Sequence, residues 1–588
     1  MENNRRFLLA VALSALALFA FQFLFPTPKT PAARPSAAVA PAGQPGAPTT
    51  PPSTPGVAAA AAAGAALPAP AASAETVTVA GPRAAYRVAA QGAALVGAEM
   101  TGYRNLHLGA ARQREGQPPV QLARPGDALL SYRLVVAGDT VPLARVPFTV
   151  APQGADGATG AVPAGAARVL RLDGQVPTRA GVVPVSLTYD VRPDSFALRV
   201  RGAVQAAGPA FLLVDLPPTI APTERDTADH LNHLSFAWKP AAGSAKGEAF
   251  GGLDPGERRL VADSLSWAVA KSKYFLVGVL APQGGRPFSE LSLEGGVRTG
   301  KAATRARGTL VVPVANGGFG LDVYAGPQEW RRLVAQGRHF EDSNPYGGWL
   351  QGIVQPFATI AIRGVLWMHD TLRLSYGWVL VALGVLVRLV LWPLQQNMMR
   401  NQLKMQRIQP EMTLVQQRYK NDPQRMQQEM MAVYAAHGVS PFATITGCLP
   451  MLLPMPIFFA LFFVFQNTIE FRGVPFLWMA DISLKDPFYV LPVLVAATQF
   501  LISWIGMRGQ PPNPQTQMLT YFMPAMFLVF FVNVAAGLNL YYLTQNLVMI
   551  PQQWLLARER VKAGGTPTAP VVQGTPTRPA KPAKERLA

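Results

Sequence analysis

The stretch Gly377–Leu394 (GWVLVALGVLVRLVLWPL) carries one charged residue, Arg388, in an otherwise apolar run without an acid. A run of this length can cross a bilayer as a helix. One arginine near the centre of such a helix costs about 2.5–3.5 kcal/mol, so it is rarely left in lipid without a use. Because Arg388 lies roughly 9 Å from the end of the run, a side chain that snorkels to the interface is the alternative to a functional one.

The composition is that of a membrane protein with soluble parts. The chain has 588 residues, of which 49% are hydrophobic and 14% charged, whereas soluble chains average about 25% charged. The formal charge of +19 suggests nucleic acid or anionic lipid as a partner, once the charges are placed relative to the membrane. A single cysteine, Cys448, excludes an intramolecular disulfide and a cysteine-based zinc site.

The N-terminus predicts a membrane anchor over residues 1–26. Phe7–Phe25 is apolar and uncharged, and Arg5 and Arg6 precede it. Since a cleaved signal peptide has an apolar core of only about 7–15 residues, we expect an uncleaved span whose N-terminus is cytoplasmic. A-x-A-like patterns near Ala37–Ala42 keep cleavage as the alternative. Residues 27–76 are rich in Pro and Ala and predict a linker.

Residues 77–344 predict an all-β sandwich of two packed antiparallel sheets. Apolar residues alternate along Val185–Val191 and again along Phe196–Val200, with a turn expected at Pro193-Asp194. Similar strands recur at Phe211–Leu216, Tyr274–Leu280, Thr309–Val314 and Gly320–Tyr324. Because the first span leads outward, we expect this domain to be extracytoplasmic.

The rest of the chain predicts an α-helical polytopic membrane protein with six spans in all. Residues 345–376 are apolar but interrupted by polar residues, which favours an amphipathic helix at the outer interface. The stretch Thr516–Leu556 is about 60 Å long as one helix, so it must fold back, most plausibly at Asn533–Gly537. The five spans after the sandwich are expected at 377–394, 448–466, 488–507, 516–534 and 538–556.

The distribution of cations supports this count. The expected helical hairpin 395–447 and the tail 557–588 are rich in Lys and Arg. The loop Asn467–Pro487 has only Arg472 and Lys485 against three acids. Six spans with both termini inside place every cation-rich segment in the cytoplasm. Five spans would instead place the basic tail on the outer side of the membrane.

The hairpin has a functional and a structural interpretation. Met398, Met405 and Met412 repeat every seven residues, and Asn421-Asp422-Pro423 breaks the helix. A methionine-rich surface beside a basic face could adapt to varied clients or to lipid headgroups. The alternative is a solvated loop that only sets topology. The basic face consists of Arg400, Lys404 and Arg407.

Polar residues in the later spans suggest a hydrated pocket around Arg388. The alternative is interhelical hydrogen bonding, worth about 0.6 kcal/mol for each bond. These residues are Gln499, Ser503, Asn533, Asn539, Thr544, Gln545 and Asn546. The span Cys448–Gln466 (CLPMLLPMPIFFALFFVFQ) is rich in Pro, Met and Phe, which suggests an adaptable apolar wall. Ordinary packing between helices is the alternative.

Signals of enzymatic chemistry are absent from the sequence. No G-x-x-x-x-G-K-[ST] loop occurs, so nothing suggests nucleotide hydrolysis. His230 and His233 are three residues apart, but no further clustered ligands accompany them. We therefore expect no enzyme activity, no cofactor and no metal site.

Several motifs together resemble the YidC-type membrane-protein insertases of the YidC/Oxa/Albino family, in the Gram-negative form with a large periplasmic domain. The resemblance to the membrane core covers about Pro345–Val561, and Val77–Val334 is similar to the periplasmic sandwich in position and strand pattern. The motifs are VRLVLWPL with the following cationic hairpin, QQEMMAVY, CLPMLLPMPIFFALFF, DPFYVLPVL and GLNLYYLTQNLVMIPQQ.

The resemblance implies a hydrated groove, open to the cytoplasm and to lipid, and an apolar slide along the third and fifth spans. By this resemblance Arg388 is the groove arginine, and Tyr541 and Tyr542 match a tyrosine pair of the last span. Together with the polar residues noted above, the expected groove residues are Arg388, Gln499, Ser503, Tyr541, Tyr542, Gln545 and Asn546. The implied slide residues are Met455, Pro456, Phe458, Phe530 and Phe531. Two departures affect the expected shape of the groove: Gly384 replaces a polar residue of some relatives, and Asn533 falls where an aromatic residue is common.

The implied function is insertion and folding of inner-membrane proteins, alone or with the Sec translocon. Implied partners are nascent and newly made membrane proteins, the ribosome and anionic lipids, with no specific DNA. A secondary transporter or channel that uses Arg388 to bind substrate is the main rival, although such folds usually show repeated halves and we see none. An anchored periplasmic binding module is a second rival, which would not explain five further spans. Depletion would discriminate, by leaving either membrane proteins uninserted or a solute untransported.

Overall fold

The computed structural model describes residues 75–107, 117–150, 168–191, 195–300, 302–346, 350–437, 454–508 and 514–563. The chain divides into two compact units, Met1–Pro356 with Asn467–Glu470 and Phe357–Gln466 with Phe471–Ala588. The expected first span and the basic tail from residue 564 onward lie outside the described residues, as do Pro193-Asp194 and Cys448.

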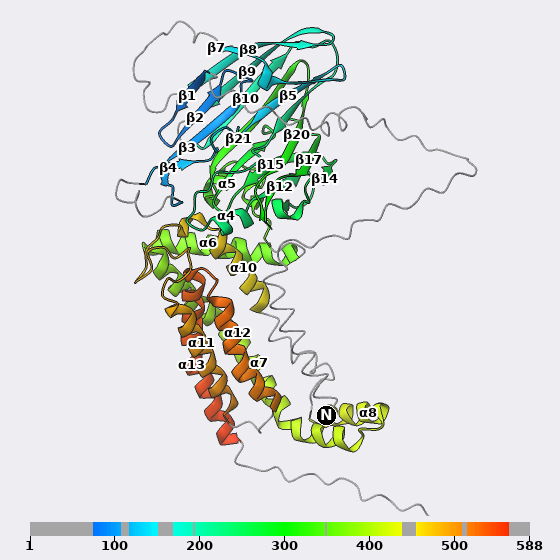
Figure 1. The fold of residues 1–588 in the computed structure, drawn as a ribbon. Helices are drawn as coiled ribbons and strands as arrows, with labels where there is room; N and C mark the ends of the chain where they lie inside the picture. The colour runs from blue at the N-terminus through cyan, green and yellow to red at the C-terminus, as the bar shows by residue number, and fades with distance from the viewer. Residues whose placement is uncertain are drawn as a thin grey trace, which may run out of the picture. The chain divides into compact units, whose positions relative to one another are not determined.

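The first unit contains two large antiparallel sheets, which confirms the expected β-sandwich (Figure 1). In spatial order, the nine-stranded sheet contains β13 (Lys246–Ala249), β12 (Ser235–Pro240), β15 (Leu265–Lys271), β16 (Phe275–Leu280), β21 (Gly318–Pro327), β10 (Ala197–Val204), β9 (Gly181–Val191), β8 (Arg168–Thr178) and β7 (Phe148–Val150). The six-stranded sheet contains β14 (Arg258–Val261), β17 (Glu290–Gly295), β20 (Ala306–Val314), β11 (Ala210–Asp215), β5 (Ser131–Val136) and β6 (Asp139–Pro142).

Smaller elements complete this unit. A four-stranded sheet contains β1 (Thr76–Ala80), β2 (Ala84–Ala89), β3 (Leu95–Arg104) and β4 (Pro119–Gln121). A two-stranded ribbon contains β18 (Arg298–Thr299) and β19 (Ala302–Ala303). Two short helices, α4 (Thr227–Asn232) and α5 (Trp330–Ala335), follow strands of the large sheets.

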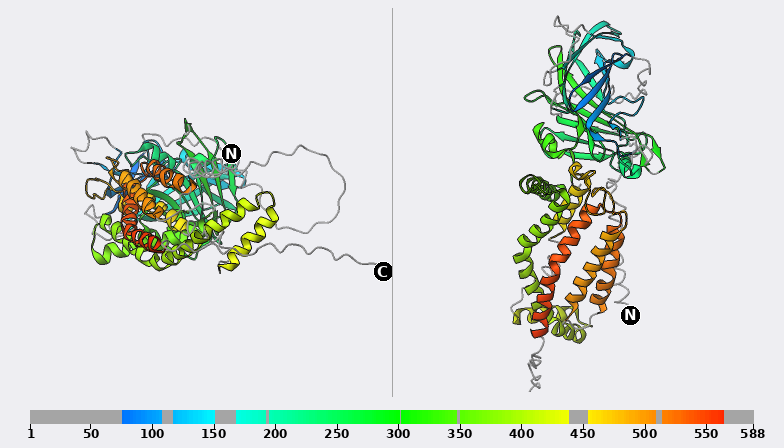
Figure 2. Two further views of the ribbon diagram at one scale, coloured as in Figure 1. Left: turned by 90° about the horizontal axis from the view of Figure 1, so that it is seen from below. Right: turned by 90° about the vertical axis from the view of Figure 1, so that its left-hand side faces the viewer.

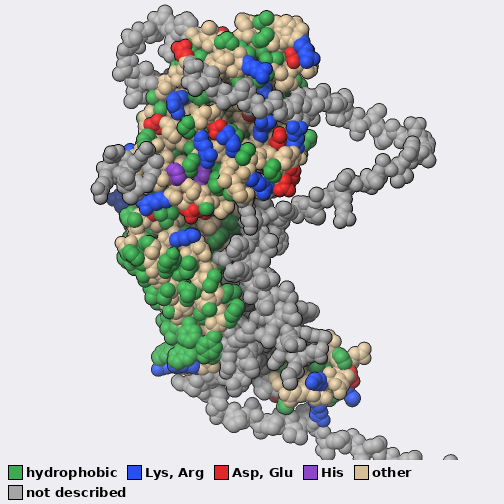
Figure 3. Space-filling view, viewed as in Figure 1, with side chains coloured by type: hydrophobic (Ala, Val, Ile, Leu, Met, Phe, Trp, Pro, Cys, Tyr) green, Lys and Arg blue, Asp and Glu red, His purple; other side chains and the backbone are tan. Residues whose placement is uncertain are grey.

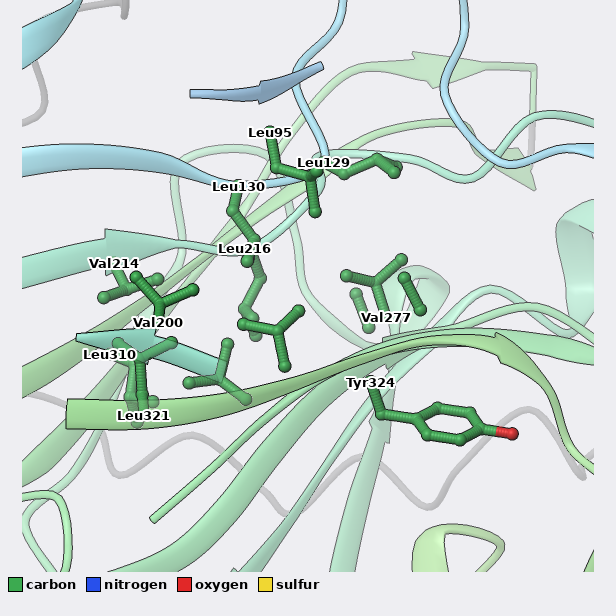
Figure 4. Packing of buried hydrophobic residues seen from close by; sticks show 14 of the residues in the cluster. Leu95, Leu129, Leu130, Val200, Val214, Leu216, Val277, Leu310, Leu321 and Tyr324 are labelled. Carbon is green, nitrogen blue, oxygen red and sulfur yellow. The ribbon is translucent and has the colours of Figure 1, made fainter. Parts of the chain in front are cut away.

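The period of two in the sequence determines which strand faces enter the core. Along β9 the residues Val183 to Val191 alternate between buried and partly exposed, and Leu198 and Val200 do the same on β10. Figure 4 shows the result: Val200 and Leu321 from the nine-stranded sheet pack in one cluster with Val214 and Leu310 from the six-stranded sheet. The alternation in the sequence therefore correctly predicted the core of the sandwich.

The second unit is helical. Helix α11 packs against both α12 and α13, and α13 also packs against α7 (Figure 2). Helix α6, which begins in the first unit, leads into this unit. The helices are α6 (Gln351–Leu372), α7 (Tyr376–Arg418), α8 (Pro423–Ala436), α10 (Pro454–Asn467), α11 (Val490–Met507), α12 (Pro514–Phe531) and α13 (Ala536–Ala563).

Helix α7 is one continuous helix that joins the Arg388 run to the first arm of the expected hairpin. It ends near Asp422, whose side chain caps α8 by accepting a hydrogen bond from the backbone N–H of Arg425 at 3.1 Å. Ile408 and Met412 of α7 are buried against Tyr434 of α8. Helices α7 and α8 therefore pack against each other here, and Met412 belongs to the buried contact between them rather than to an adaptable surface.

The apolar helices account for part of the expected span count. Among the described residues, two helices are long and apolar enough to cross a membrane, Tyr376–Pro393 and Val490–Met507. Two further apolar helices, Pro456–Asn467 and Thr520–Phe531, are shorter. Helix α13 has the necessary length, but it carries buried polar residues that lower its hydropathy, among them Asn539, Asn546 and Gln552. The count of six spans is therefore not confirmed.

Helix α6 has two apolar faces. Val354, Ala358 and Ile362 are buried at spacings of four residues. Ile353, Phe357, Ile360 and Trp367 are exposed on another face, with Ile360 68% exposed. An exposed apolar stripe of this kind suits a helix that lies in a membrane interface.

Candidate functional site

Arg388 lies inside the helical unit. Its side chain extends from α7 toward α13, where Nη2 donates a hydrogen bond to Oε1 of Gln552 at 2.9 Å. Arg388 is 6% exposed and Gln552 is 2% exposed. The guanidinium is therefore held between two helices by a buried hydrogen bond to a neutral side chain.

One face of α13 carries the polar groups nearest to Arg388. Tyr541, Gln545 and Gln552 are four and seven residues apart, so they line the same side of the helix. Gln545 Nε2 donates to the Tyr541 hydroxyl at 2.9 Å, and Tyr541 lies near Arg388. Four residues thus form a polar row between α7 and α13.

This polar row contains unsatisfied donors. Arg388 Nε and Gln552 Nε2 are buried and have no hydrogen-bond partner within the described part of the chain. No carboxylate in that part forms an ion pair with Arg388 either. Buried donors in folded proteins are nearly always bonded, to protein or to water, so these two N–H groups can donate hydrogen bonds to an incoming acceptor.

Other polar residues singled out in the sequence hold helices together. Asn546 donates to Thr498 Oγ1 at 3.1 Å and to the carbonyl of Val495 on α11. Asn539 donates to the carbonyls of Phe531 and Val534, where α12 has just ended. Gln499 and Ser503 are partly buried on α11, and no described contact joins them to Arg388. Of the expected groove residues, the structure therefore brings together Arg388, Tyr541 and Gln545.

Three of the expected slide residues, Phe458, Phe530 and Phe531, form an aromatic wall across three helices together with Tyr542. The ring of Phe458 on α10 lies 5.9 Å from Phe530 on α12 and 5.4 Å from Tyr542 on α13. Phe531 lies 5.1 Å from Tyr542. Tyr542 thus contacts the wall, although the sequence analysis assigned it to the groove. Pro456 is partly exposed on α10, and the side chain of Met455 lies outside the described residues.

The two sequence departures have structural explanations. A Cβ on Gly384 would lie 3.1 Å from Thr544, so glycine permits the close approach of α7 and α13 beside Arg388. Asn533 is exposed between α12 and α13 and accepts a hydrogen bond from Lys485 at 3.3 Å. It lies outside the aromatic wall, in the segment where the chain was expected to fold back.

The outer surface of the helices is strongly apolar. Figure 3 shows hydrophobic side chains covering the region of α11 and α13. Phe500 and Trp504 of α11, Tyr521 of α12 and Leu547 of α13 are all exposed. A soluble monomer rarely exposes a contiguous apolar surface of this size, so lipid is the fitting environment.

Two other groups of expected residues stay apart from this site. Arg400, Lys404 and Arg407 lie within the bounds of α7, but their side chains lie outside the described residues. In the sandwich, His230 bonds to the carbonyl of Ile220, and His233 bonds to Asp229. Because the two histidines have different partners, their spacing is explained by local structure.

Comparisons with known proteins assign both units. Residues 367–563 match the family model of the 60Kd inner membrane protein, and residues 76–360 match that of the YidC periplasmic domain. The chain is 33% identical to the membrane protein insertase YidC of Anaeromyxobacter dehalogenans over 587 residues, which covers 96% of this chain and 99% of the relative. The chain belongs to the YidC family of membrane protein insertases. The family resemblance expected from the sequence motifs is thereby confirmed.

The chain is also similar to a further relative and to a solved structure. The YidC insertase of Ralstonia nicotianae is 39% identical over 255 residues, 43% of this chain and 44% of the relative. A crystal structure of an active YidC insertase with its first transmembrane domain resolved is similar over 82% of this chain and 93% of that chain, at 17% identity and a TM-score of 0.32. The relatives are named insertases, which are not enzymes, and their names do not favour a transporter.

Sequence reasoning missed Gln552, the residue that bonds to Arg388 in this YidC family member. Gln552 was part of a quoted motif, GLNLYYLTQNLVMIPQQ, but its role was not assigned. One signal could have found it. Gln552 lies eleven residues after Tyr541, about three helical turns, and so continues the polar face of Tyr541 and Gln545.

Proposed function

We propose that this protein inserts newly made inner-membrane proteins by receiving the client's polar tail at Arg388 and its apolar segment along the aromatic wall. The burial of Arg388 and its bond to Gln552 carry this proposal. Removing a guanidinium from water is costly, and one hydrogen bond to a neutral amide does not offset that cost. We therefore infer that the protein keeps Arg388 here because it uses the charge. Two unsatisfied donors beside it offer hydrogen bonds to a tail that is leaving water.

Insertion by this route is facilitated partitioning without covalent chemistry. The positive potential of Arg388 attracts acidic or polar groups of the short tail that must cross. A hydrated groove at Arg388 shortens the apolar path for that tail. Release into lipid is driven by burial of the client's apolar segment, at about 25 cal/mol per Å².

The wall formed by α10, α12 and α13 suits a client of variable sequence. Its contacts are between rings of Phe458, Phe530, Phe531 and Tyr542, and their mutual tilts range from 44° to 89°. Aromatic rings give a large apolar surface without directional polar groups. Such a surface accepts many apolar helices and selects for hydrophobicity rather than for sequence.

The proposed topology has six spans in a Gram-negative inner membrane, with both termini and the α7–α8 hairpin in the cytoplasm and the sandwich in the periplasm. The cation-rich segments 395–447 and 557–588 support this orientation by the positive-inside rule. The exposed apolar stripe of α6 supports an interfacial position between sandwich and spans.

The proposed partners follow from the same charges. Nascent chains are clients either directly or together with the Sec translocon. The basic tail recruits ribosomes, whose RNA surface is polyanionic. The face of Arg400, Lys404 and Arg407 attracts anionic lipid headgroups.

Photo-crosslinking of stalled nascent chains tests the proposal. A photoreactive residue at Phe458 or Phe530 should crosslink to the client's apolar segment. The matched control is Trp504, an aromatic residue exposed on α11 and away from the wall contacts. Equal crosslinking from position 504 would show that the client touches the helices indiscriminately, and it would overturn the assignment of the wall.

A further inference from the structure

The β-sandwich contains a cavity of about 330 Å³ between the ends of β10 and β21 and helix α5. Three arginines line it, Arg199, Arg332 and Arg338, together with one carboxylate, Asp322. The apolar part of the lining includes Phe196 and Leu198. A volume above roughly 300 Å³ is within the range of small-molecule sites in proteins.

Arg199 and Arg338 share a single counter-ion. Arg199 and Asp322 are directly opposite each other on the antiparallel strands β10 and β21, and Arg199 Nε lies 3.1 Å from Asp322 Oδ1. Arg338 Nη2 lies 2.7 Å from the other carboxylate oxygen. Because one carboxylate serves two guanidinium groups, this part of the wall has an excess of one positive charge.

Arg332 is held in place by Glu329, which in turn bonds to Tyr103. Arg332 on α5 bonds to Glu329, and the Tyr103 hydroxyl donates to the other oxygen of the same carboxylate. Burial, together with the neighbouring Glu329, raises the pKa of Tyr103 well above its ordinary value, so the phenol stays a donor. The guanidinium also lies 5.1 Å from the centre of the Phe196 ring. These contacts orient the Arg332 side chain, which also lines the cavity.

The backbone that presents Arg338 is unusual. Gly337, Arg338 and His339 have φ values of 69°, 57° and 53°, three consecutive left-handed residues of which two are not glycine. The indole N–H of Trp267 donates to the carbonyl of Arg338 at 3.1 Å and fixes this conformation. Arg338 Nε is buried and has no acceptor among the described residues.

We propose that this cavity binds a small oxyanion, a carboxylate or a phosphate ester, through Arg199, Arg332 and Arg338. Three guanidinium groups with one lining carboxylate can donate paired N–H···O hydrogen bonds to the oxygens of such an anion. The site belongs to the sandwich, so it is independent of client insertion at Arg388. Its occupant is either a soluble anion or the phosphate of a lipid headgroup.

Titration calorimetry of the full-length protein in detergent tests the site, with glycerol 3-phosphate and acetate as probes and sodium chloride at equal ionic strength as blank. The wild type should show saturable binding. Arg332→Gln and Arg199→Gln should each weaken it by at least about tenfold. The matched control is Arg201→Gln, which removes the same charge from an exposed position two residues along β10, outside the cavity lining.

A variant that is expected to bind more tightly distinguishes a true site from a loss of binding caused by misfolding. Asp322→Asn removes the internal anion that competes for Arg199 and Arg338, so it should bind the probes more tightly than the wild type. A merely structural ion-pair network predicts weaker or absent binding instead. Absence of saturable wild-type binding, or an equal loss in Arg201→Gln, would likewise overturn the site.

Nanodiscs distinguish the two sources of the anion. If a lipid headgroup occupies the site, glycerol 3-phosphate should bind more weakly in phosphatidylglycerol nanodiscs than to the lipid-free protein in detergent. Arg332→Gln supplies the baseline for non-specific repulsion by the anionic membrane. Equal affinity in nanodiscs and in detergent would assign the site to a soluble ligand.

Discussion

Arg388 of α7 and Gln552 of α13 are 164 residues apart in the chain, yet they form a buried hydrogen bond of 2.9 Å. The pair joins two helices that Gly384 allows to approach closely one turn earlier. Both partners also keep an unsatisfied donor, Nε of Arg388 and Nε2 of Gln552. The bond therefore fixes the position of the charge without neutralising it.

The first prediction separates the charge of Arg388 from its detailed chemistry. Arg388→Lys should retain much insertion activity, because the positive potential remains. Arg388→Ala should fail chiefly with clients whose translocated tails are acidic. The measurement compares one client carrying either acidic or neutral tail residues, with variant levels matched by immunoblot. If the Ala variant inserts both clients as well as wild type, Arg388 is only a topological anchor.

The second prediction concerns Gln552. Gln552→Glu places a carboxylate where Arg388 already donates a bond, so the fold should persist while the free positive charge is lost. Insertion of acidic-tailed clients should then fall toward the level of Arg388→Ala, and neutral-tailed clients should be less affected. Gln553→Glu, one residue away and not bonded to Arg388, is the control. Undiminished insertion of acidic tails by Gln552→Glu would contradict a role for the potential.

The third prediction is a pH dependence at Glu470, which belongs to the first unit with its neighbours Thr468 and Ile469. Burial, reinforced by the Glu329 carboxylate, raises the pKa of Glu470 from 4.5 to about 7. Because the folded state holds this proton more tightly than the unfolded state, stability falls as pH rises between these values. Glu470→Gln should remove that loss, worth at most about 3 kcal/mol.

Hydrogen exchange in the peptide around residues 467–471 measures this effect. Glu470→Gln should slow exchange relative to wild type at pH 7.5, after correction for the intrinsic rate, and should change little at pH 5. Glu75→Gln, at an exposed position, should change nothing at either pH. Faster exchange in Glu470→Gln at pH 7.5 would mean that the charged form stabilises the fold.

The fourth prediction addresses topology. With Cys448 replaced by Ser, cysteines are introduced singly at Ser195 in the sandwich and at Ala569 in the tail. An impermeant thiol reagent should label position 195 but not position 569 in intact spheroplasts. Both positions should react after lysis, which controls for accessibility. Labelling of position 569 from outside would rule out a cytoplasmic tail and with it six spans.

The sequence predicted what depends on local periodicity. The strands around Val185 and Leu198 were correct because a buried sheet face must alternate with period two. Arg388 was singled out because a charge is conspicuous in an apolar run. The break at Asp422 was correct because aspartate before proline is a strong helix-capping signal.

Contacts between residues far apart in the chain could not be predicted from the sequence. Nothing in the chain states that Arg388 meets Gln552 rather than Gln499 or Ser503, since each lies on a helix of similar composition. Gly384 seemed to be a missing polar residue, whereas its role is steric and depends on Thr544 across the interface. The three arginines of the sandwich cavity come from β10, α5 and the turn after it, and only their folded positions make them a cluster.

The continuity of α7 determines where this part of the protein can bend. The helix includes Pro393 and Pro410, and each proline deletes one main-chain hydrogen bond, which makes those turns the softest points of the rod. Both follow Arg388, while Ile408 and Met412, which hold the hairpin, lie beyond the first. If the hairpin moves, we therefore expect α7 to flex near residue 393, so that Arg388, which precedes this point, keeps its position.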